Sequence, residues 1–297
     1  MSISRQTLTI VIVTFKSEKV IDNCIKSISD NIKIIVVENS NNQKFKDTLE
    51  KKYRNVKCIL SSSNLGMGSG NNLGLSYVKT DYALILNPDV ILYENTISEI
   101  INESKKIESF IVLAPLLDDD NYPNYKIKKE DKKNISNHSP FKVQSVDGFA
   151  MLINLNKIDQ IEDFRDKKYF DENFFMYLEN DDFCKRLTQC DQNVFIIPKS
   201  KIRHLGAKGV SDEYAYEVEL SRNWHWIWSK FYYKKKHSGY FAALINGFPS
   251  FFSAILKYIL YLITLNSKKR SVYLQRVMGY LNAAAGRKSF YRPNIKI

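Results

Sequence analysis

Acidic side chains are missing from the last part of the chain. Residues 222–297 contain no Asp or Glu, but they hold 14 of the 44 Lys and Arg residues, all three Trp and 17 of the aromatic residues. Residues 1–221 are nearly neutral, so the net charge of +12 comes from this basic tail. Cations interleaved with amphipathic aromatic rings are typical of segments that lie on an anionic membrane surface. No recognisable reading module accompanies the charge, so we expect no nucleic-acid partner.

Cysteine, proline and glycine are scarce as well. The four cysteines form neither a CxxC pair nor a metal-ligand spacing, which excludes a disulfide scaffold and a zinc site of that kind. With 44% apolar residues in 297, a disordered chain is excluded, and one large or two modest domains are expected. Met1 to Gln6 lack the pattern of a signal peptide, so we expect a cytoplasmic protein.

Apolar, β-branched runs alternate with amphipathic segments in residues 1–116. The runs are continuous, which is typical of parallel strands covered on both faces, and the intervening segments have helical spacing. The pattern predicts a βαβ series and an α/β fold with an open, doubly wound, mostly parallel sheet. The expected strands are Leu8–Thr14, Ile32–Glu38, Val56–Leu60, Tyr82–Leu86 and Phe110–Leu116. The expected helices are Glu18–Ser29, Gln43–Tyr53, Gly68–Val78 and Asn95–Lys106.

The rest of the chain changes character twice. Residues 117–142 are polar and charged, which predicts an exposed loop, and apolar patterning resumes at residue 143. Short strands are expected at residues 143–146, 150–154 and 193–198, with a helix at residues 180–188. The expected C-terminal helices are Asp212–Tyr233, Tyr240–Leu265 with a break at Gly247–Pro249, and Ser267–Ala285. We therefore expect one domain over residues 1–210 and a helical region over residues 211–297.

Polar residues follow the predicted strands at their carboxyl ends, where open α/β sheets bind ligands. Asn87-Pro88-Asp89 follows the fourth strand, where Asp89 could hold a hard divalent cation, although this tripeptide is also an ordinary turn. His204 follows a later strand and could complete such a site, or it could form a structural hydrogen bond.

Glycines cluster between Asn64 and Gly74, after the third strand. A dinucleotide fingerprint would follow the first strand, so that interpretation is not favoured. Two others stay open. The small residues could allow an anion to approach the start of a helix, or they could allow the helix to pack tightly on the sheet.

An acidic turn surrounded by aromatic residues covers residues 169–183. Its Glu179-Asn180-Asp181-Asp182 run opens a predicted helix, so the carboxylates could cap that helix, with Arg186 as a surface partner of Asp182. They could instead supply a general base in a partly apolar pocket, where burial raises the proton affinity of a carboxylate.

Seven segments, taken in this order, resemble the inverting glycosyltransferases of family 2, especially the bacterial rhamnosyltransferase-like branch. They are IVIVTFKS from Ile10, IIVVENS from Ile34, NLGMGSGNNLG from Asn64, LILNPD from Leu84, VDGFAMLI from Val146, FDENFFMYLENDDFCKRL from Phe170 and IRHLGAKG from Ile202. The resemblance implies a GT-A fold, a nucleotide-diphosphate sugar donor, Mg²⁺ or Mn²⁺, and transfer with inversion to a glycan or polyprenyl-linked acceptor in cell-surface polysaccharide biosynthesis. Residues 1–116 would be the nucleotide-binding half, and residues 143–210 the acceptor and catalytic half.

The resemblance also implies residue roles. Residues of the nucleoside and donor site would be Thr14, Glu38, Asn64, Gly66, Gly70, Asn71 and Asn87. Residues bordering the sugar and acceptor pocket would be Gly148 and Phe149, and metal ligands would be Asp89 and His204. The branch resemblance favours dTDP-L-rhamnose as donor.

Three positions depart from the family pattern. Glu38 replaces an Asp, and Asn87 replaces the first Asp of the metal motif. Where the family has Glu-Asp-x-Asp, Asn180 replaces an Asp, and an amide cannot accept a proton. We therefore expect Glu179 to be the catalytic base, with Asp182 as the second candidate.

Alternatives remain for the activity and for the tail. The departures favour, as a rival, a non-catalytic nucleotide-sugar-binding or assembly protein of a polysaccharide pathway. For residues 222–297 we expect an interfacial helical hairpin at the inner face of the cell membrane. A helical cap, a homodimer interface or a membrane span from His237 to Leu256 are the alternatives.

Overall fold

The computed structural model describes residues 3–119, 121–206, 210 and 212–295. The chain divides into two units. The first contains Met1–Asp171 and Asn180–Ser211, and the second contains Glu172–Glu179 and Asp212–Ile297. The short segment Glu172–Glu179, which the sequence analysis counts with residues 1–210, thus belongs with the C-terminal helices.

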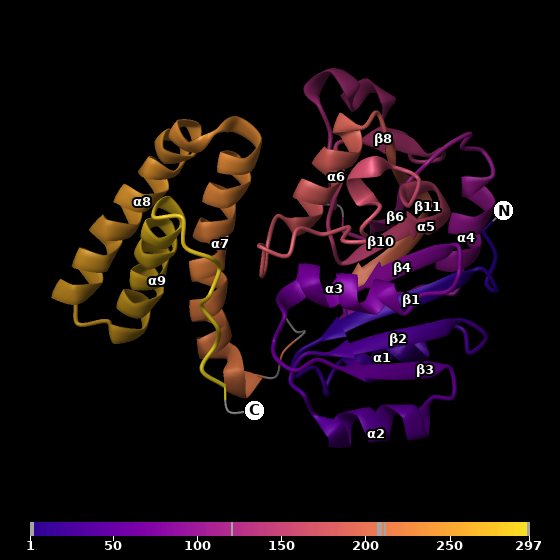
Figure 1. Ribbon diagram of the computed structural model, residues 1–297, viewed down its shortest axis with the longest axis horizontal. Coiled ribbons are helices and arrows are strands. Elements are labelled where there is room, and N and C mark those ends of the chain that lie inside the picture. Colours follow the sequence, from indigo (N-terminus) through magenta and orange to yellow (C-terminus); the bar gives the residue numbers. More distant parts are fainter. Residues whose placement is uncertain (1–2, 120, 207–209, 211, 296–297) are drawn as a thin grey trace. The chain divides into compact units, whose positions relative to one another are not determined.

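The first unit is built on a 9-stranded sheet in the order β3-β2-β1-β4-β10-β6-β11-β5, with β8 beside β11 (Figure 1). Strands β1 to β4, β6 and β11 point in one direction, whereas β5, β8 and β10 run against them. The strands are β1 (Leu8–Thr14), β2 (Lys33–Glu38), β3 (Val56–Leu60), β4 (Tyr82–Leu86), β5 (Val90–Leu92), β6 (Val112–Leu117), β8 (Phe141–Val143), β10 (Ala150–Asn154) and β11 (Val194–His204). The predicted α/β sheet is confirmed.

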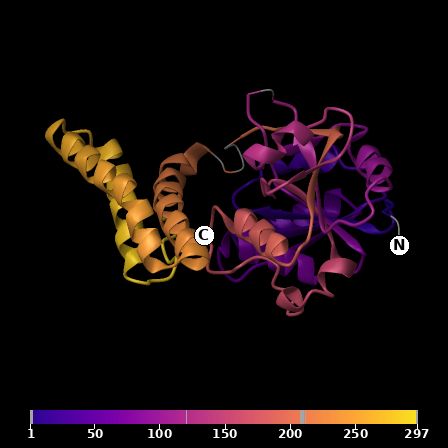
Figure 2. The same cartoon turned by 90° about the horizontal axis from the view of Figure 1, so that it is seen from above.

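Helices cover both faces of the sheet because alternate residues of its strands are apolar on both sides (Figures 1 and 2). On β1, Ile10 and Ile12 pack in one core cluster and Val11 packs in the other. The first cluster takes residues of α1 (Ile21–Lys26), α2 (Gln43–Lys52) and α4 (Thr96–Ser104). The second takes residues of α3 (Gly66–Ser76), α5 (Leu155–Ile158) and α6 (Glu179–Gln189).

Residues 117–142 hold more structure than their polar composition predicts. Strand β7 (Tyr125–Lys126) pairs antiparallel with β9 (Ser145–Val146), and a 3-10 helix, η1, spans Lys129–Asn134. Asn124 is fully buried, where its side chain accepts from the amide of Leu117 and donates to the carbonyl of Pro115. These contacts fix the start of the segment against the end of β6, although η1 itself has no buried residue.

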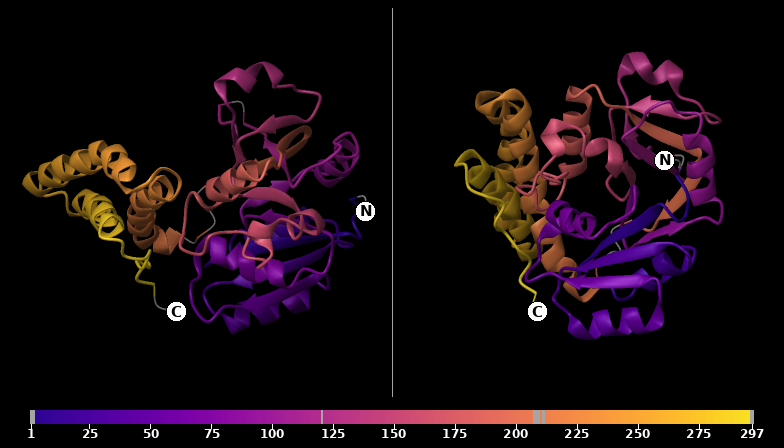
Figure 3. Two further views of the ribbon diagram at one scale, coloured as in Figure 1. Left: turned by 45° about the horizontal axis from the view of Figure 1, so that its top comes forward. Right: turned by 45° about the vertical axis from the view of Figure 1, so that its right-hand side comes forward.

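The second unit consists mainly of three helices packed on one another: α7 (Ala215–Ser238), α8 (Tyr240–Ile263) and α9 (Ser267–Ala284) (Figures 1 and 3). Its core is aromatic and includes Trp224, Trp228 and Tyr280. The predicted break at Gly247–Pro249 is wrong, because α8 is continuous through Pro249. Proline removes one backbone N–H from the helix, so the carbonyl of Ile245 lacks its helical partner, and Ile245 as a residue is 76% exposed.

Candidate active site and family

Asp89 and His204 are brought together by β5, a short strand that sequence patterning does not predict. The end of β11 pairs antiparallel with β5, with His204 opposite Val90, and the amide of Leu205 donates to the carbonyl of Asp89 at 3.0 Å. The imidazole Nε2 of His204 consequently lies 3.2 Å from Oδ1 of Asp89. The two residues are 115 positions apart in sequence.

Phe149 fixes the ring of His204 from the other side. The two rings stack with centroids 4.3 Å apart, and the backbone carbonyl of Phe149 accepts from the amide of Asn87 at 2.9 Å. The side chain of Asp89 is 5% exposed and that of His204 is 19% exposed. The dyad is therefore held rigidly and remains partly open to solvent.

A divalent cation fits the chemistry of this corner. Asp89 offers a carboxylate and His204 an imidazole, and Oδ1 of Asn87 is a buried amide oxygen without a hydrogen-bond partner. An orphaned carbonyl oxygen beside a carboxylate suits a hard cation. In the described part of the chain, no group of three or more His, Cys, Asp or Glu could enclose a metal ion. Further ligands would have to come from substrate or water.

Thr14 and Glu38 lie side by side at the ends of β1 and β2, in register with each other. Both are almost fully buried. The carboxylate of Glu38 accepts backbone hydrogens from Ser40 at 2.8 Å and from Asn42 at 2.6 Å, where α2 begins. Thr14 donates to the carbonyl of Val37 at 3.2 Å. The extra methylene of Glu38 thus lets its carboxylate close the β2–α2 turn.

The glycine cluster serves packing in its second half. A Cβ at Gly70 would lie 2.8 Å from Cγ1 of Val13, and one at Gly74 would lie 2.4 Å from Cγ1 of Val11. At Gly70 and Gly74, these short distances favour the interpretation that the glycines allow α3 to pack closely on β1.

The start of α3 is shaped differently. Gly66 has a φ of 80°, and its amide donates to Oδ1 of Asn64 at 3.1 Å, so a left-handed turn leads into the helix. Asn71 is buried, and its Oδ1 has no hydrogen-bond partner. Asn64, Gly66 and Asn71 therefore stay candidates for donor binding.

Asn180 and Asp181 tie the acidic turn to the strands beside it. Nδ2 of Asn180 donates to the carbonyl of Val146 at 2.7 Å, and a Cβ at Gly148 would lie 3.3 Å from Cβ of Asn180. Asp181 accepts from Oγ of Ser145 at 2.7 Å and forms an ion pair of 2.6 Å with Lys126. Both oxygens of Asp181 are thereby engaged.

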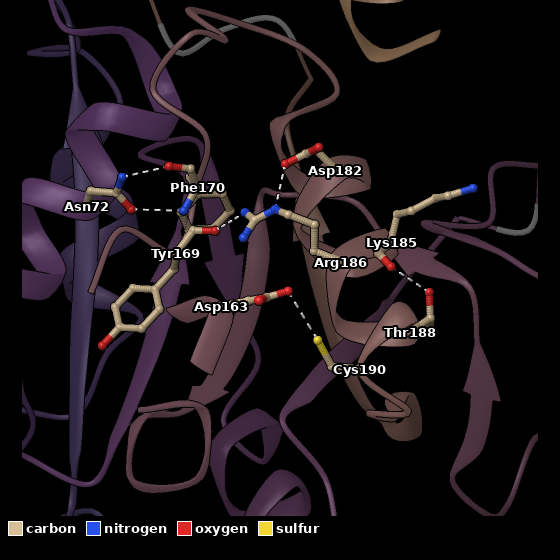
Figure 4. Close-up of polar contacts among 9 residues, drawn as sticks. All are labelled: Asn72, Asp163, Tyr169, Phe170, Asp182, Lys185, Arg186, Thr188 and Cys190. Carbon is tan, nitrogen blue, oxygen red and sulfur yellow. Dashed lines mark hydrogen bonds and ion pairs between the residues drawn. The ribbon is translucent and has the colours of Figure 1, made fainter. Parts of the chain in front are cut away.

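Asp182 forms a buried ion pair with Arg186. Its side chain is 0% exposed, and Oδ2 lies 2.9 Å from Nε of Arg186, which is itself only 16% exposed. The guanidinium also donates to the carbonyl of Tyr169 (Figure 4). It lies over the ring of Phe164 as well. The pairing at i,i+4 is present, but it is not on the surface. This enclosure disfavours Asp182 as the base, and its role as the second candidate stays a prediction.

Glu179 is the first residue of α6 and is 9% exposed. Glu179 and the seven residues before it belong to the second unit, where Phe175 packs on His225 with ring centroids 4.5 Å apart. Tyr177 and Leu178 have φ angles of 71° and 68°, a strained left-handed pair of the kind found at functional sites. The role of Glu179 as base stays a prediction.

Asp147 is a further candidate carboxylate for the site, and the sequence does not predict it. It is half-buried on the turn between β9 and β10, and Tyr122 donates to its Oδ2 at 3.0 Å. Burial is the main cause that raises its pKa, and the charge of Asp181 adds to the rise. Asp147 lies inside the VDGFAMLI segment, next to Gly148, so the family resemblance covers its position. Its local sequence, however, looks like that of an ordinary turn residue.

Comparison with known proteins identifies the family. Residues 9–184 match the model of glycosyl transferase family 2. The chain belongs to this family. The resemblance of its ordered segments is thereby confirmed.

Two curated relatives are similar over nearly two thirds of the chain. The first is the low-salt glycan biosynthesis hexosyltransferase Agl10 of Haloferax volcanii, 26% identical over 202 residues, which cover 63% of each protein. The second is the rhamnosyltransferase WbbL of Escherichia coli K12, 27% identical over 219 residues, which cover 64% of this chain and 80% of WbbL. The chain thus spans less than two thirds of the length of Agl10.

Solved structures of low sequence identity share the fold. GalNAc-T7, solved with UDP, GalNAc and Mn²⁺, superposes with a TM-score of 0.57 at 14% identity, covering 79% of this chain and 52% of that one. Residues 1–349 of S. aureus TarS superpose with a TM-score of 0.51 at 13% identity, covering 96% and 93%. The predicted GT-A fold is confirmed, together with the C-terminal helical region.

Proposed function

We propose that the chain is an inverting glycosyltransferase that moves a sugar from a nucleotide-diphosphate donor to a hydroxyl of a glycan or lipid-linked acceptor. The observation that carries this proposal is the contact between Asp89 and His204 at 3.2 Å. A carboxylate and an imidazole at strand ends, in a chain of family 2, are suited to a donor diphosphate and its cation.

Mg²⁺ or Mn²⁺ is the cofactor that we propose for this corner. Asp89, His204 and the amide oxygen of Asn87 would hold it, and when bound it would neutralise charge on the departing diphosphate. Phe149 keeps the imidazole in one orientation by stacking on it. The low exposure of Asp89 strengthens its electrostatic attraction for a cation, because little water screens the carboxylate.

The donor that we test first is dTDP-L-rhamnose. The two curated relatives are a hexosyltransferase and a rhamnosyltransferase, so UDP-hexoses form the comparison group. In a panel of nucleotide sugars, only the correct donor should raise the melting temperature of the protein. The rise should be larger with Mn²⁺. NMR of the product from that donor should then show the inverted anomeric configuration. Retained configuration with an active enzyme would exclude the inverting mechanism.

A non-catalytic nucleotide-sugar-binding protein is the second candidate. Asn180 favours it, because its amide donates to Val146 where the family has an acid. The two candidates differ in one assay. The binding protein would bind the donor with Mn²⁺ but yield neither transferred sugar nor hydrolysed donor over long incubation, whereas the enzyme would yield one of them.

For the tail, we infer that α8 lies on an anionic lipid surface at the inner face of the cell membrane. Large apolar side chains recur at three- and four-residue spacing along its exposed side: Phe241, Ile245, Phe248, Phe252, Leu256, Ile259 and Ile263. Helix α8 is the one helix in the described residues that is long and apolar enough to cross a membrane. Its other side packs within the second unit through Ala243 and Ala254.

The size and setting of this stripe support a lipid surface as its partner. Contiguous apolar patches of this length are rare on monomeric soluble proteins. Lysines stand at both ends of α8, at 234–236 before it and at 268–269 after it, where they could contact anionic headgroups.

Liposome flotation tests this inference. The wild type should float with vesicles that contain anionic lipid, and less so at high salt. Ile245→Ser, in the stripe, should reduce flotation, whereas Ile135→Ser, which changes an exposed isoleucine of the first unit, should not. Flotation that Ile245→Ser leaves unchanged would contradict the membrane inference. So would a stable dimer in light scattering that Ile245→Ser dissociates, because the stripe would then be a dimer interface.

A further inference from the structure

The family position of the proton acceptor holds an amide in this chain, and the carboxylates beside it are engaged. Asn180 has no basic oxygen that could take a proton at neutral pH. Asp181 is bound by Lys126 and Ser145, and Asp182 is enclosed with Arg186. The contacts of Asp181 and Asp182 leave two kinds of candidate for the base, which are Glu179, the preceding residue, and a carboxylate on another segment.

The side chain of Asn180 points to another place. Its Nδ2 donates to the carbonyl of Val146, and its Cβ and Cγ lie 3.3 and 3.6 Å from the Cβ that Gly148 would carry. Asp147 stands between these two contacts in the chain. An aspartate at position 180 could not make this bond, because an ionised carboxylate would face a carbonyl oxygen. The amide is thus matched to the turn that carries Asp147.

The same turn reaches the Asp89–His204 dyad two residues later. Phe149 stacks on His204, and its carbonyl accepts from Asn87. The segment from Val146 to Phe149 is therefore fixed to the acidic turn at one end and to the dyad at the other. Asp147 thus stands on the segment that connects the acidic turn to the Asp89–His204 dyad.

Asp147 has the surroundings of a general base. Tyr122 donates to Oδ2 at 3.0 Å, and no other side chain in the described part of the molecule donates to this carboxylate, which leaves Oδ1 for an acceptor hydroxyl. Its amide donates to the carbonyl of the buried Asn124, which anchors the backbone.

Several groups set the proton affinity of Asp147. Burial raises its pKa, the hydrogen bond from Tyr122 lowers it, Asp181 raises it, and Lys126 and His204 lower it, with a net rise. A raised pKa brings a carboxylate closer to the operating pH, which favours proton transfer.

We propose that Asp147 accepts the proton of the acceptor hydroxyl in this chain, and that Asn180 is the positioning residue that holds its turn. The inference rests on the proposed glycosyl transfer. The acceptor oxygen forms a bond to the anomeric carbon while its proton passes to Oδ1 of Asp147. The bond from that carbon to the diphosphate oxygen breaks, and its electron pair leaves with the nucleoside diphosphate.

Asp147→Asn tests the proposal, because it preserves shape and removes basicity. We expect kcat for transfer to fall at least about 100-fold, while donor binding by calorimetry stays within about twofold of wild type. Asp30→Asn, the same change at an exposed aspartate, is the matched control and should keep wild-type kcat. Asp147→Glu should recover part of the activity, because it restores a carboxylate.

The pH profile separates a proton acceptor from a structural residue. Wild-type kcat should rise with pH as the carboxyl of Asp147 ionises, which gives the pH profile an acidic limb. Asp147→Asn should abolish this pH dependence and not merely lower kcat by the same factor at every pH. Asn180→Asp adds a second carboxylate beside the turn, so the limb should move to higher pH. An unmoved limb would contradict the positioning role.

Two results keep this inference separate from the proposed function. If wild type transfers no sugar from any donor in the panel, the proposed function itself fails. If wild type is active and Asp147→Asn stays active, while Glu179→Gln is inactive with intact donor binding, the base is Glu179 and the assignment of Asp147 is overturned.

Discussion

The ion pair between Asp182 and Arg186 allows a sharp test, because a structural and a catalytic role predict opposite results. Asp182→Asn removes the charge and keeps the shape. In the wild type, Oδ2 of Asp182 lies 2.9 Å from Nε of Arg186, at 0% and 16% side-chain exposure. The guanidinium also binds the carbonyl of Tyr169 (Figure 4). After the substitution, Arg186 remains where water cannot replace the lost charge.

The expected cost follows from that burial. Removing one partner of a buried pair typically costs 3–5 kcal/mol, and an amide oxygen that still accepts a hydrogen bond lowers this to about 2–4 kcal/mol. For a slope of about 2 kcal/mol per M of urea, the unfolding midpoint of the first unit should fall by about 1–2 M. The total stability of a domain is only about 5–15 kcal/mol, so the loss is a large fraction of it.

Urea unfolding followed by far-UV circular dichroism is the suitable assay. Tryptophan fluorescence would not serve, because Trp224, Trp226 and Trp228 all lie in the second unit. Arg186→Met supplies the control through a double-mutant cycle. Asp182→Asn should cost much less in the Arg186→Met background, since no buried cation is then left unpaired.

A wild-type urea midpoint for Asp182→Asn, combined with lost transfer and intact donor binding, would refute this reasoning. Asp182 would then be catalytic, and its pairing with Arg186 would be a ground-state arrangement that opens during the reaction.

Three further predictions concern other parts of the molecule. Gly74→Ala should destabilise the first unit in urea by about 1–2 kcal/mol, because crowding against Val11 outweighs the gain in helix propensity; Val11→Ala in the same chain should restore part of the loss. Burial lowers the pKa of His225 to about 3, so the folded state binds fewer protons than the unfolded state between about pH 3 and 6.5. The second unit, followed by tryptophan fluorescence, should therefore lose up to about 1.4 kcal/mol per pH unit as pH falls below 6.5, and His225→Gln should flatten that slope. Asp89→Asn should weaken Mn²⁺-dependent nucleotide binding in calorimetry about tenfold or more, and equal binding with and without the carboxylate would count against a metal at this site.

The strands and the helix partners of the sheet follow from local pattern. Continuous apolar runs are typical of strands buried on both faces of a parallel sheet, and β1, β3 and β4 lie where the sequence predicts them. Short strands carry too little pattern, and β5 spans only Val90–Leu92. The same limit applies to Pro249, because α8 continues through it and local sequence does not show the packing that holds this helix together.

The residues of the candidate site were predictable from the sequence, but their grouping was not. The order of the motifs made Asp89 and His204 candidates, since each follows a strand at the edge where such sheets bind ligands. Which carboxylates are engaged was decided by contacts across long sequence distances. Asp181 is bound by Ser145 from 36 positions away.

Local sequence therefore determined the sheet, the helices and the set of candidate residues for the site, because periodicity and strand ends are properties of neighbouring residues. Tertiary structure alone decided which carboxylate is fully enclosed and which one is only half-buried. Asp182 and Asp147 look alike in sequence, yet one is bound to Arg186 at 0% exposure and the other is half-buried beside Tyr122. Proton affinity depends on solvation and on charges in space, and the packing of the whole unit sets both.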